Sequence, residues 1–209
     1  MNDQLIDDVI ERALAEDAPW GDITSEVFVP EDAVATAVLN AREPGVASGL
    51  GVFARTFMLV DADAKVILHA SDGDTFTAGQ KLATVSGNAR AVLRAERIAL
   101  NLSQRMSGIA THTAAYVVAV AGTRARIVDT RKTTPGLRAL ERHAVRCGGG
   151  YNHRFSLSDA VMAKDNHRAV LAAAGIDLGD AIRRARVSIG HTTHLEVEVD
   201  RLDQVEIVI

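Results

Sequence analysis

The sequence predicts an α/β protein, and two observations in its second half support this fold class. After residue 122, short apolar runs alternate with segments of helical periodicity, which is typical of a parallel sheet or a (β/α) barrel. The runs span residues 126–129, 160–164 and 194–199. Charged residues stand at or near the ends of these runs, namely Arg131, Lys132, Lys164 and Glu198. Since barrel enzymes carry their catalytic groups at the C-terminal ends of strands, this pattern favours an enzyme.

The first half is predicted to mix helices with short strands. Apolar residues spaced along one face predict helices over residues 3–16 and 50–60. Short runs of small, apolar or β-branched residues predict strands over residues 33–42, 65–69 and 82–85.

From residue 89 onward the pattern is helical again. Ser107-Gly108 is expected to break this helix, and a second helix is expected to run to about Val120, with Gly122 at its end. Later helices are expected over residues 135–147, 166–174 and 177–188, and a further one begins near Arg201.

Composition limits the function classes. The chain has 209 residues and a formal net charge of −4, which argues against a dedicated nucleic-acid binder. Cys147 is the only cysteine, so no intramolecular disulfide can form, which fits a reducing cytoplasm. The N-terminus has no signal-peptide pattern, and the longest apolar stretch, around residues 114–121, is far shorter than the roughly 20 residues of a membrane span. We therefore expect a cytoplasmic protein with no membrane or nucleic-acid partner.

Residues 128–168 form a cationic stretch in this acidic chain. Its cations are Arg131, Lys132, Arg138, Arg142, Arg146, Arg154, Lys164 and Arg168, and its anions are Asp129, Glu141, Asp159 and Asp165. A local excess of positive charge of this kind usually binds an anion. The alternative is a solvated helix face that carries many arginines.

Two loops in the cationic stretch favour anion binding over that alternative. Residues 133–136 form a hydroxyl-rich turn before a helix, and hydroxyls and helix N-termini bind phosphate and carboxylate oxygens. Residues 148–150 are three glycines, followed by Tyr151-Asn152-His153-Arg154, which predicts a mobile loop with cationic and hydrogen-bonding side chains. Three glycines cost chain entropy, which argues against a purely structural loop.

The acidic residues near the C-terminus and the histidine and cysteine pairs each allow more than one interpretation. Glu196, Glu198 and Asp200 are expected on one face of a strand, where they could bind Mg²⁺ or sugar hydroxyls, or could simply face solvent at a sheet edge. His143 and Cys147 have a spacing that could suit zinc, and so do His191 and His194. Neither pair belongs to a visible ligand set, so metal binding by them is not expected.

Five segments together carry a resemblance to a known family. They are ALAEDAPWGDITSE near the N-terminus, ERIALNLSQRMSGIAT from Glu96, DTRKTTPGLR from Asp129, GGGYNHRFSLSDAVMAKDNH from Gly148 and EVEVD from Glu196. In this order, and over the length of the chain, they resemble quinolinate phosphoribosyltransferase. The resemblance implies that quinolinate and phosphoribosyl pyrophosphate react, with Mg²⁺ as cofactor, to give nicotinate mononucleotide, CO2 and pyrophosphate in NAD biosynthesis.

The resemblance also implies an architecture. An N-terminal α/β sandwich-like domain over residues 1–109 would precede an incomplete (β/α) barrel over residues 110–209, and two chains would pair so that each N-terminal domain covers the other's barrel mouth. The family continues beyond the length of this chain, so the barrel is expected to be truncated at its C-terminus, with residues 194–199 as an exposed sheet edge.

Site residues follow from the resemblance position by position. The quinolinate carboxylates would be held by Arg105, Arg131, His153, Arg154 and Lys164. Thr130 and Lys132 would lie beside them, with Lys132 reaching toward the phosphoribosyl group and Glu198 facing the ribose hydroxyls and Mg²⁺. Lys132, Lys164 and Glu198 would be catalytic, and Arg105 would come from the partner chain of a homodimer.

Two other functions remain open at this stage. One is a related protein with the phosphoribosyltransferase fold that is linked to molybdenum-transport operons and acts on another substrate. The other is a non-catalytic anion-binding protein derived from the same fold. Several guanidinium groups suit a dicarboxylate, which favours quinolinate over the first alternative.

Overall fold

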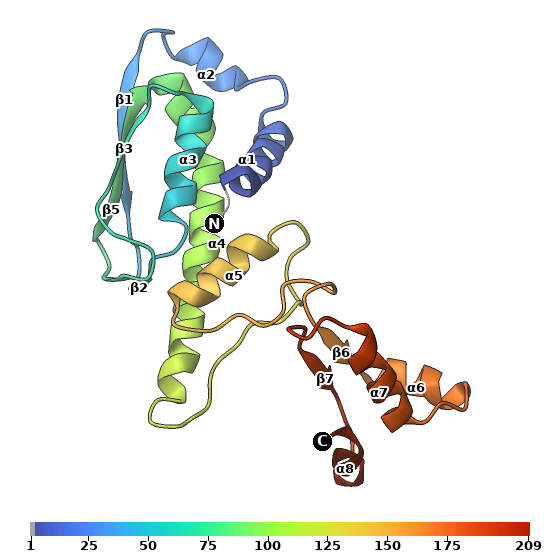
Figure 1. Ribbon diagram of the computed structural model, residues 1–209. Coiled ribbons are helices and arrows are strands. Elements are labelled where there is room, and N and C mark those ends of the chain that lie inside the picture. Colours follow the sequence, from blue (N-terminus) through green and yellow to red (C-terminus); the bar gives the residue numbers. More distant parts are fainter. Residues whose placement is uncertain (1–2) are drawn as a thin grey trace. The chain divides into compact units, whose positions relative to one another are not determined.

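The computed structural model describes residues 3–209, which belong to two compact units (Figure 1). The first unit ends at His153 and the second comprises Arg154–Ile209. Both contain helices and strands, which confirms the mixed α/β class. Among the described residues, no helix combines the length and the apolar character needed to cross a bilayer.

The first unit is built on a three-stranded antiparallel sheet with the order β1-β5-β3. The strands are β1 (Val34–Asn40), β3 (Lys65–Leu68) and β5 (Lys81–Asn88), close to the predicted ranges. A separate two-stranded sheet joins β2 (Gly45–Val46) to β4 (Thr75–Phe76). The helices are α1 (Asp3–Asp17), α2 (Ile23–Phe28), α3 (Leu50–Val60), α4 (Ala89–Ala119) and α5 (Arg138–Cys147). Sequence reasoning missed α2, which begins where the Asp22 side chain accepts a hydrogen bond from the Ser25 N–H.

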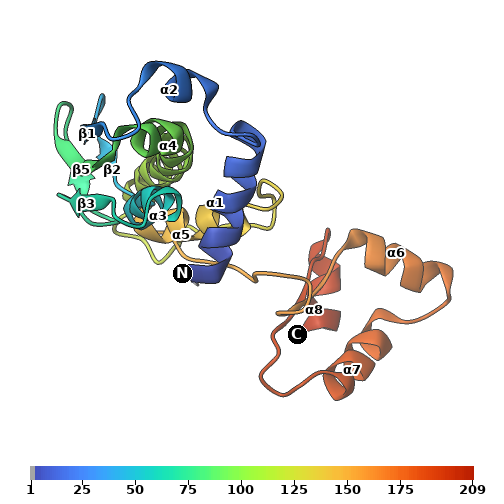
Figure 2. The same ribbon diagram turned by 90° about the horizontal axis from the view of Figure 1, so that it is seen from above.

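Helices α3 and α4 cover one face of the sheet, and α1 lies on their far side (Figure 2). The core between sheet and helices contains Phe53 and Phe57, whose rings meet edge to face, together with alanines and valines of β5 and α4. A second core joins α1, α3, α4 and α5 around Met106 and Leu140. Helix α5 is therefore anchored to α4 by buried apolar contacts, and this anchoring positions the polar residues of α5 described below.

The expected break at Ser107-Gly108 is wrong, because α4 runs unbroken from Ala89 to Ala119. Met106 and Ala110 are buried on either side of the expected break. The Ser107 hydroxyl accepts a hydrogen bond from the Ser48 N–H and donates one to the Ser48 carbonyl, both at 3.1 Å. These contacts with the α3 side of the core outweigh the roughly 1 kcal/mol that a glycine costs inside a helix.

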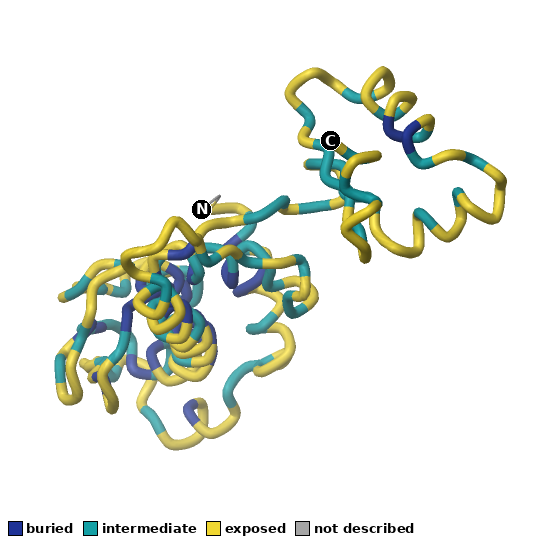
Figure 3. Tube along the Cα trace, turned by 90° about the horizontal axis from the view of Figure 1, so that it is seen from below, coloured by how far each residue is buried: buried dark blue, intermediate teal, exposed yellow. Residues whose placement is uncertain are grey.

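The second unit contains a parallel pair of strands, β6 (Val161–Ala163) and β7 (Leu195–Val197), with Val161 opposite Leu195. Helices α6 (Asp165–Ala173) and α7 (Leu178–Ser188) come between these strands in the chain, and a 3-10 turn η1 (Leu202–Gln204) and helix α8 (Val205–Val208) follow them. This order confirms the predicted alternation of strand and helix. Figure 3 shows that buried residues are dense in the first unit and sparse in the second, where Gly179 and Ile182 are the buried ones among the described residues.

Two expectations for the last part of the first unit, residues 126–147, are corrected. The predicted strand over residues 126–129 is only an isolated parallel bridge between Val128 and Tyr151, since its backbone hydrogen bonds to the facing segment are those of Ile127 and Asp129 with Tyr151. The helix expected from Pro135 begins at Arg138, since Gly136 has φ +81° and cannot belong to a right-handed helix.

Two of the three glycines at 148–150 have a packing role that the sequence did not predict, and the mobility expected of this loop stays a prediction. A Cβ on Gly148 would lie 2.3 Å from the Ala110 carbonyl oxygen, and a Cβ on Gly150 would lie 2.9 Å from a Thr113 methyl carbon. Both glycines are buried, so the end of α5 lies directly against α4 with no space for a side chain. Gly148 and Gly150 are therefore required by packing, contrary to the expectation that the three glycines indicate a loop that is not purely structural.

We predict opposite stability effects for one substitution at two glycines of this region. Gly148→Ala should destabilise the fold by about 1–3 kcal/mol, because its methyl group would overlap the α4 backbone. Gly108→Ala should stabilise it by about 0.5–1 kcal/mol, since Gly108 is exposed within α4 and nothing lies within 4 Å of the new Cβ. Urea denaturation measures both, and equal effects of the two substitutions would contradict the packing role of Gly148.

Candidate active site

The candidate site in the first unit is organised by the carboxylate of Asp129. Its side chain is only 6% exposed and forms an ion pair with Arg142 of α5 at 3.2 Å. Asp129 also accepts hydrogen bonds from the Asn152 amide at 2.6 Å and from the His153 backbone N–H at 2.7 Å. Arg142 in turn donates to the His153 carbonyl at 2.8 Å. These contacts fix the segment that follows Asp129 beside His153, so two predicted substrate-binding segments are joined by one buried ion pair.

Arg105 of α4 is held by residues of its own chain. Its guanidinium forms an ion pair with Glu141 of α5 at 2.5 Å and also donates to the Thr134 hydroxyl. Glu141 accepts a further hydrogen bond from the Thr134 N–H at 3.3 Å. Burial raises the pKa of Glu141, but the hydrogen bonds from Arg105 and Thr134 outweigh it and bring the pKa below its ordinary value. The carboxylate is therefore ionised, and it orients Arg105 and the 133–134 segment together.

The turn between Asp129 and α5 presents Thr130, Arg131 and Lys132. The Thr130 hydroxyl accepts a hydrogen bond from the Lys132 N–H at 3.1 Å, which shapes the turn, and the Lys132 residue is exposed. The Nε of Arg131 is buried and has no hydrogen-bond partner. A buried guanidinium donor left without an acceptor is rare and costs free energy, so this nitrogen is well suited to a ligand oxygen.

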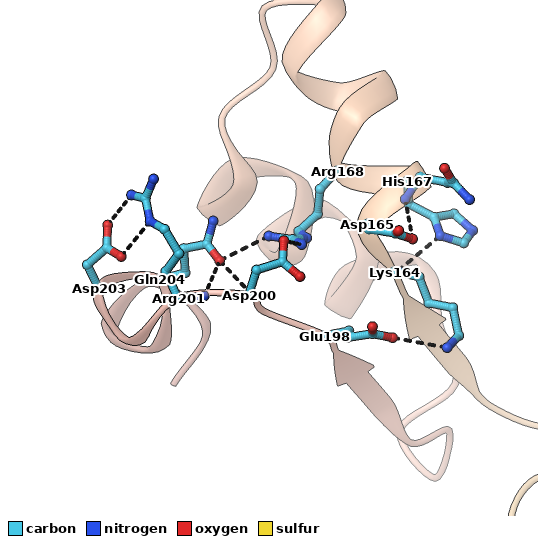
Figure 4. Close-up of polar contacts among 10 residues, drawn as sticks. Lys164, Asp165, His167, Arg168, Glu198, Asp200, Arg201, Asp203 and Gln204 are labelled. Carbon is cyan, nitrogen blue, oxygen red and sulfur yellow. Dashed lines mark hydrogen bonds and ion pairs between the residues drawn. The ribbon is translucent and has the colours of Figure 1, made fainter.

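In the second unit, the structure brings together Lys164 and Glu198, the residues predicted at two strand ends. They follow β6 and β7, and their side chains form an ion pair at 3.0 Å (Figure 4). The pairing of the parallel strands continues to this point, because the Glu198 N–H donates to the Ala163 carbonyl at 2.8 Å. Both side chains remain about half exposed, at 48% and 49%, so an incoming ligand can reach them.

The acidic face expected on the last strand is not continuous. Strand β7 ends at Val197, and Asp200 lies beyond it and pairs with Arg168 of α6. The Gln204 side-chain oxygen accepts from Arg168 at 3.0 Å and from the backbone N–H of Asp200 at 2.9 Å (Figure 4). The strand is shorter than expected because the chain turns at residues 199–201 to form this network.

Arg154, the remaining predicted site residue, opens the second unit. Its guanidinium donates to the Ala160 carbonyl at 2.8 Å, which places it over the loop that leads into β6. The Phe155 N–H donates to the Asp159 carboxylate at 2.6 Å and tightens the same loop.

Sequence reasoning missed residues that support the site instead of touching a ligand. Asp129, Glu141 and Arg142 were counted only as charges of the cationic stretch, and Gln204 was not singled out. Each acts through a partner at least 7 positions away in the chain, as in the hydrogen bond from the Thr134 N–H to Glu141. One usable signal existed, since Glu141 and Arg142 are charged residues in a helix that also carries the buried Leu140 and Ala144.

Comparison with known proteins identifies the family. The C-terminal domain of quinolinate phosphoribosyl transferase matches residues 109–209, and its N-terminal domain matches residues 22–107. The chain belongs to the quinolinate phosphoribosyl transferase family. Alignment of 204 residues with the probable nicotinate-nucleotide pyrophosphorylase (carboxylating) of Bacillus subtilis gives 42% identity, over 98% of this chain and 69% of the relative. The nicotinate-nucleotide pyrophosphorylase (carboxylating) of Mycobacterium leprae is 46% identical over 95% of this chain and 69% of its own length.

Solved structures of the quinolinate phosphoribosyl transferase family agree with the fold. NadC from Streptococcus pyogenes superposes with a TM-score of 0.91 and 44% identity, covering 99% of this chain and 72% of that one. The nicotinate-nucleotide pyrophosphorylase from Francisella tularensis gives a TM-score of 0.89 at 33% identity, covering 99% of this chain and 71% of that one. The two matched family domains meet inside α4, and the expected domain boundary between residues 109 and 110 remains a prediction.

We predict that Asp129→Asn weakens the fold and disorders the site together. The change leaves the Arg142 guanidinium, only 12% exposed, without its anion and should cost about 3 kcal/mol in unfolding free energy. Urea denaturation measures this cost. As a control, Asp203→Asn removes an exposed carboxylate paired with Arg201 and should leave the urea midpoint unchanged. Equal midpoints for both variants would contradict the organising role of Asp129.

Proposed function

We infer that this chain catalyses transfer of a phosphoribosyl group from phosphoribosyl pyrophosphate to quinolinate, with loss of CO2, giving nicotinate mononucleotide and pyrophosphate. This makes it a pentosyltransferase, a nicotinate-nucleotide diphosphorylase of the carboxylating type, in NAD biosynthesis. Family membership over nearly the whole chain supports the inference. The single structural observation that carries it is the Lys164–Glu198 pair at adjacent ends of parallel strands, where a cation and a carboxylate face the same space.

Cationic side chains are proposed to hold the two quinolinate carboxylates. A guanidinium binds a carboxylate through two parallel hydrogen bonds, so a dicarboxylate suits a site with several arginines. Following the family resemblance, we assign this role to Arg105, Arg131, His153, Arg154 and Lys164, with Thr130 and Lys132 beside them. The buried, unpartnered Nε of Arg131 supports its assignment, because a substrate oxygen would satisfy it.

Cationic and acidic side chains are proposed to act on the phosphoribosyl group. Positive charge develops at the anomeric carbon as pyrophosphate leaves, and a nearby carboxylate stabilises it. Glu198 supplies that carboxylate and faces the ribose hydroxyls, while Lys132 and Lys164 offset negative charge on substrate and leaving group. Thr130 shapes the turn that presents Lys132.

A magnesium ion fits the residues near Glu198. Mg²⁺ prefers oxygen ligands and is usually held by one or two carboxylates together with substrate phosphates. Glu198 would hold it, with the remaining positions filled by pyrophosphate oxygens and water. When bound, the ion would neutralise charge on the departing pyrophosphate.

We also propose a cytoplasmic homodimer in which the site is shared between chains. The proposal rests on the family resemblance, in which Arg105 reaches the partner's site. Within one chain Arg105 contacts Glu141 and Thr134, so those residues would orient it for that role. The cytoplasmic location rests on composition, since a single cysteine suits a reducing compartment.

The two alternatives differ in what they bind. A molybdenum-operon relative would bind phosphoribosyl pyrophosphate without quinolinate, and a non-catalytic anion binder would bind ligands without turnover. Calorimetric titration with quinolinate, with and without phosphoribosyl pyrophosphate, followed by an assay for released CO2, separates all three. Binding of quinolinate without any CO2 release would favour the non-catalytic alternative.

We predict that Arg131→Ala and Arg154→Ala each weaken quinolinate binding by about 2 kcal/mol, or roughly thirtyfold, because each removes a charge-assisted bidentate contact. Isothermal titration calorimetry with quinolinate measures the loss. Arg124→Ala is the matched control, because Arg124 is an exposed arginine outside the candidate site. Unchanged affinity in Arg154→Ala would remove Arg154 from the site.

We predict that two inactive variants restore activity when mixed. An Arg105→Ala chain lacks the residue proposed to cross to the partner, and a Lys132→Ala chain lacks a residue of the receiving site. In a mixed dimer one of the two sites keeps both residues, so up to about a quarter of the parent activity should return if the chains pair at random. Absence of rescue, with mixed dimers demonstrated by mass spectrometry, would argue against a shared site.

A further inference from the structure

Three side chains with metal-ligating atoms meet in the first unit, and none of them has a part in the proposed reaction. They are Asp72, His143 and Cys147, and their ligand atoms all lie within 4.8 Å of one another. His143 and Cys147 are four residues apart on α5 and therefore share one helix face. Asp72 comes from the turn between β3 and β4, 71 positions earlier in the chain than His143.

The cluster is held in place from both sides. One oxygen of Asp72 accepts a hydrogen bond from the Leu50 N–H at 2.9 Å, at the first residue of α3, and the other lies 2.7 Å from His143 Nε2. The turn lies directly against the end of α5, since a Cβ on Gly73 would be 3.7 Å from the Cys147 carbonyl oxygen. The ligand atoms are thus brought together by backbone packing and by contacts outside the cluster, as is typical of metal sites.

We propose that Asp72, His143 and Cys147 form a binding site for Zn²⁺. One carboxylate oxygen, one imidazole nitrogen and one thiolate sulfur are three of the four ligands of a tetrahedral zinc site, with metal–ligand distances of about 2.0–2.3 Å. A carboxylate and a thiolate together balance the charge of the ion, and water completes the coordination. The spacing of His143 and Cys147 suits zinc, but no third ligand is visible near them in the sequence. Asp72 supplies that ligand in the structure.

This site differs in kind from the magnesium site of the proposed reaction. Mg²⁺ takes oxygen ligands in octahedral geometry, whereas a set containing sulfur and nitrogen selects zinc and similar transition metals. Bound zinc would tie the 71–74 turn to α5, the helix that also carries Glu141 and Arg142. We therefore assign it a structural role that stabilises the support of the candidate site.

Zinc titration of the whole chain tests the proposal. Competition with a chromophoric chelator, run at about pH 8 because histidine and cysteine bind zinc in their deprotonated forms, should give saturable binding of one ion per chain. Cys147→Ser, His143→Gln and Asp72→Asn should each weaken it by on the order of tenfold or more. Asp74→Asn changes a carboxylate of the same turn that accepts a hydrogen bond from the Ser71 N–H and lies outside the cluster, so this variant should bind zinc like the parent. Equal affinity in the parent and in Cys147→Ser would overturn the proposal.

Cobalt substitution gives a second measurement that does not depend on the behaviour of the Asp72 variant, which could also disturb the start of α3. Cys147 is the only cysteine, so a sulfur-to-cobalt charge-transfer band in the near ultraviolet can arise only from this site. The band should appear in the parent and in Asp74→Asn and be lost in Cys147→Ser. Binding without this band, or binding abolished by His191→Ala and kept in Cys147→Ser, would place the ion elsewhere and overturn the proposal.

Discussion

The buried ion pair between Asp129 and Arg142 is the interaction on which the first unit's part of the candidate site depends. Asp129 ends the segment bridged to Tyr151, and Arg142 belongs to α5, so the pair joins a loop to a helix that is fixed by its own apolar contacts. The His153 backbone is bonded to both partners. The segment after Asp129, which carries Arg131 and Lys132, thus has a defined conformation before substrate binds. Binding therefore costs less conformational entropy.

Helix α5 also positions other polar groups, because consecutive residues of this helix contact different neighbouring elements. Successive residues of an α-helix point about 100° apart, so one helix can contact several elements at once. Glu141 holds Arg105 of α4, Arg142 holds Asp129, and His143 meets Asp72 of the β3–β4 turn. The position of this one helix therefore determines the orientation of groups that come from three separate parts of the sequence.

Features that depend on the periodicity of apolar residues could be predicted from the sequence. Features that depend on contacts between distant residues could not. Most helices and strands were predicted close to their observed ranges, and Lys164 and Glu198 were expected at strand ends, where they lie. The break expected at Gly108 and the mobility expected at Gly148 followed from local glycine preferences. In the structure core packing keeps α4 continuous at Gly108, and Gly148 packs against Ala110, a residue 38 positions earlier in the chain. Local sequence carries no record of such contacts.

The unbroken course of α4 has a consequence for how members of this family can vary in length. The two family domains meet inside this helix, which extends over about 45 Å. Inserting or deleting one residue at the junction would rotate the remainder by about 100°, moving Ala110 and Thr113 away from the glycines that pack against them. The helix therefore fixes the rotation of the residues after the junction relative to those before it. Insertions and deletions among family members are expected in loops and not within α4.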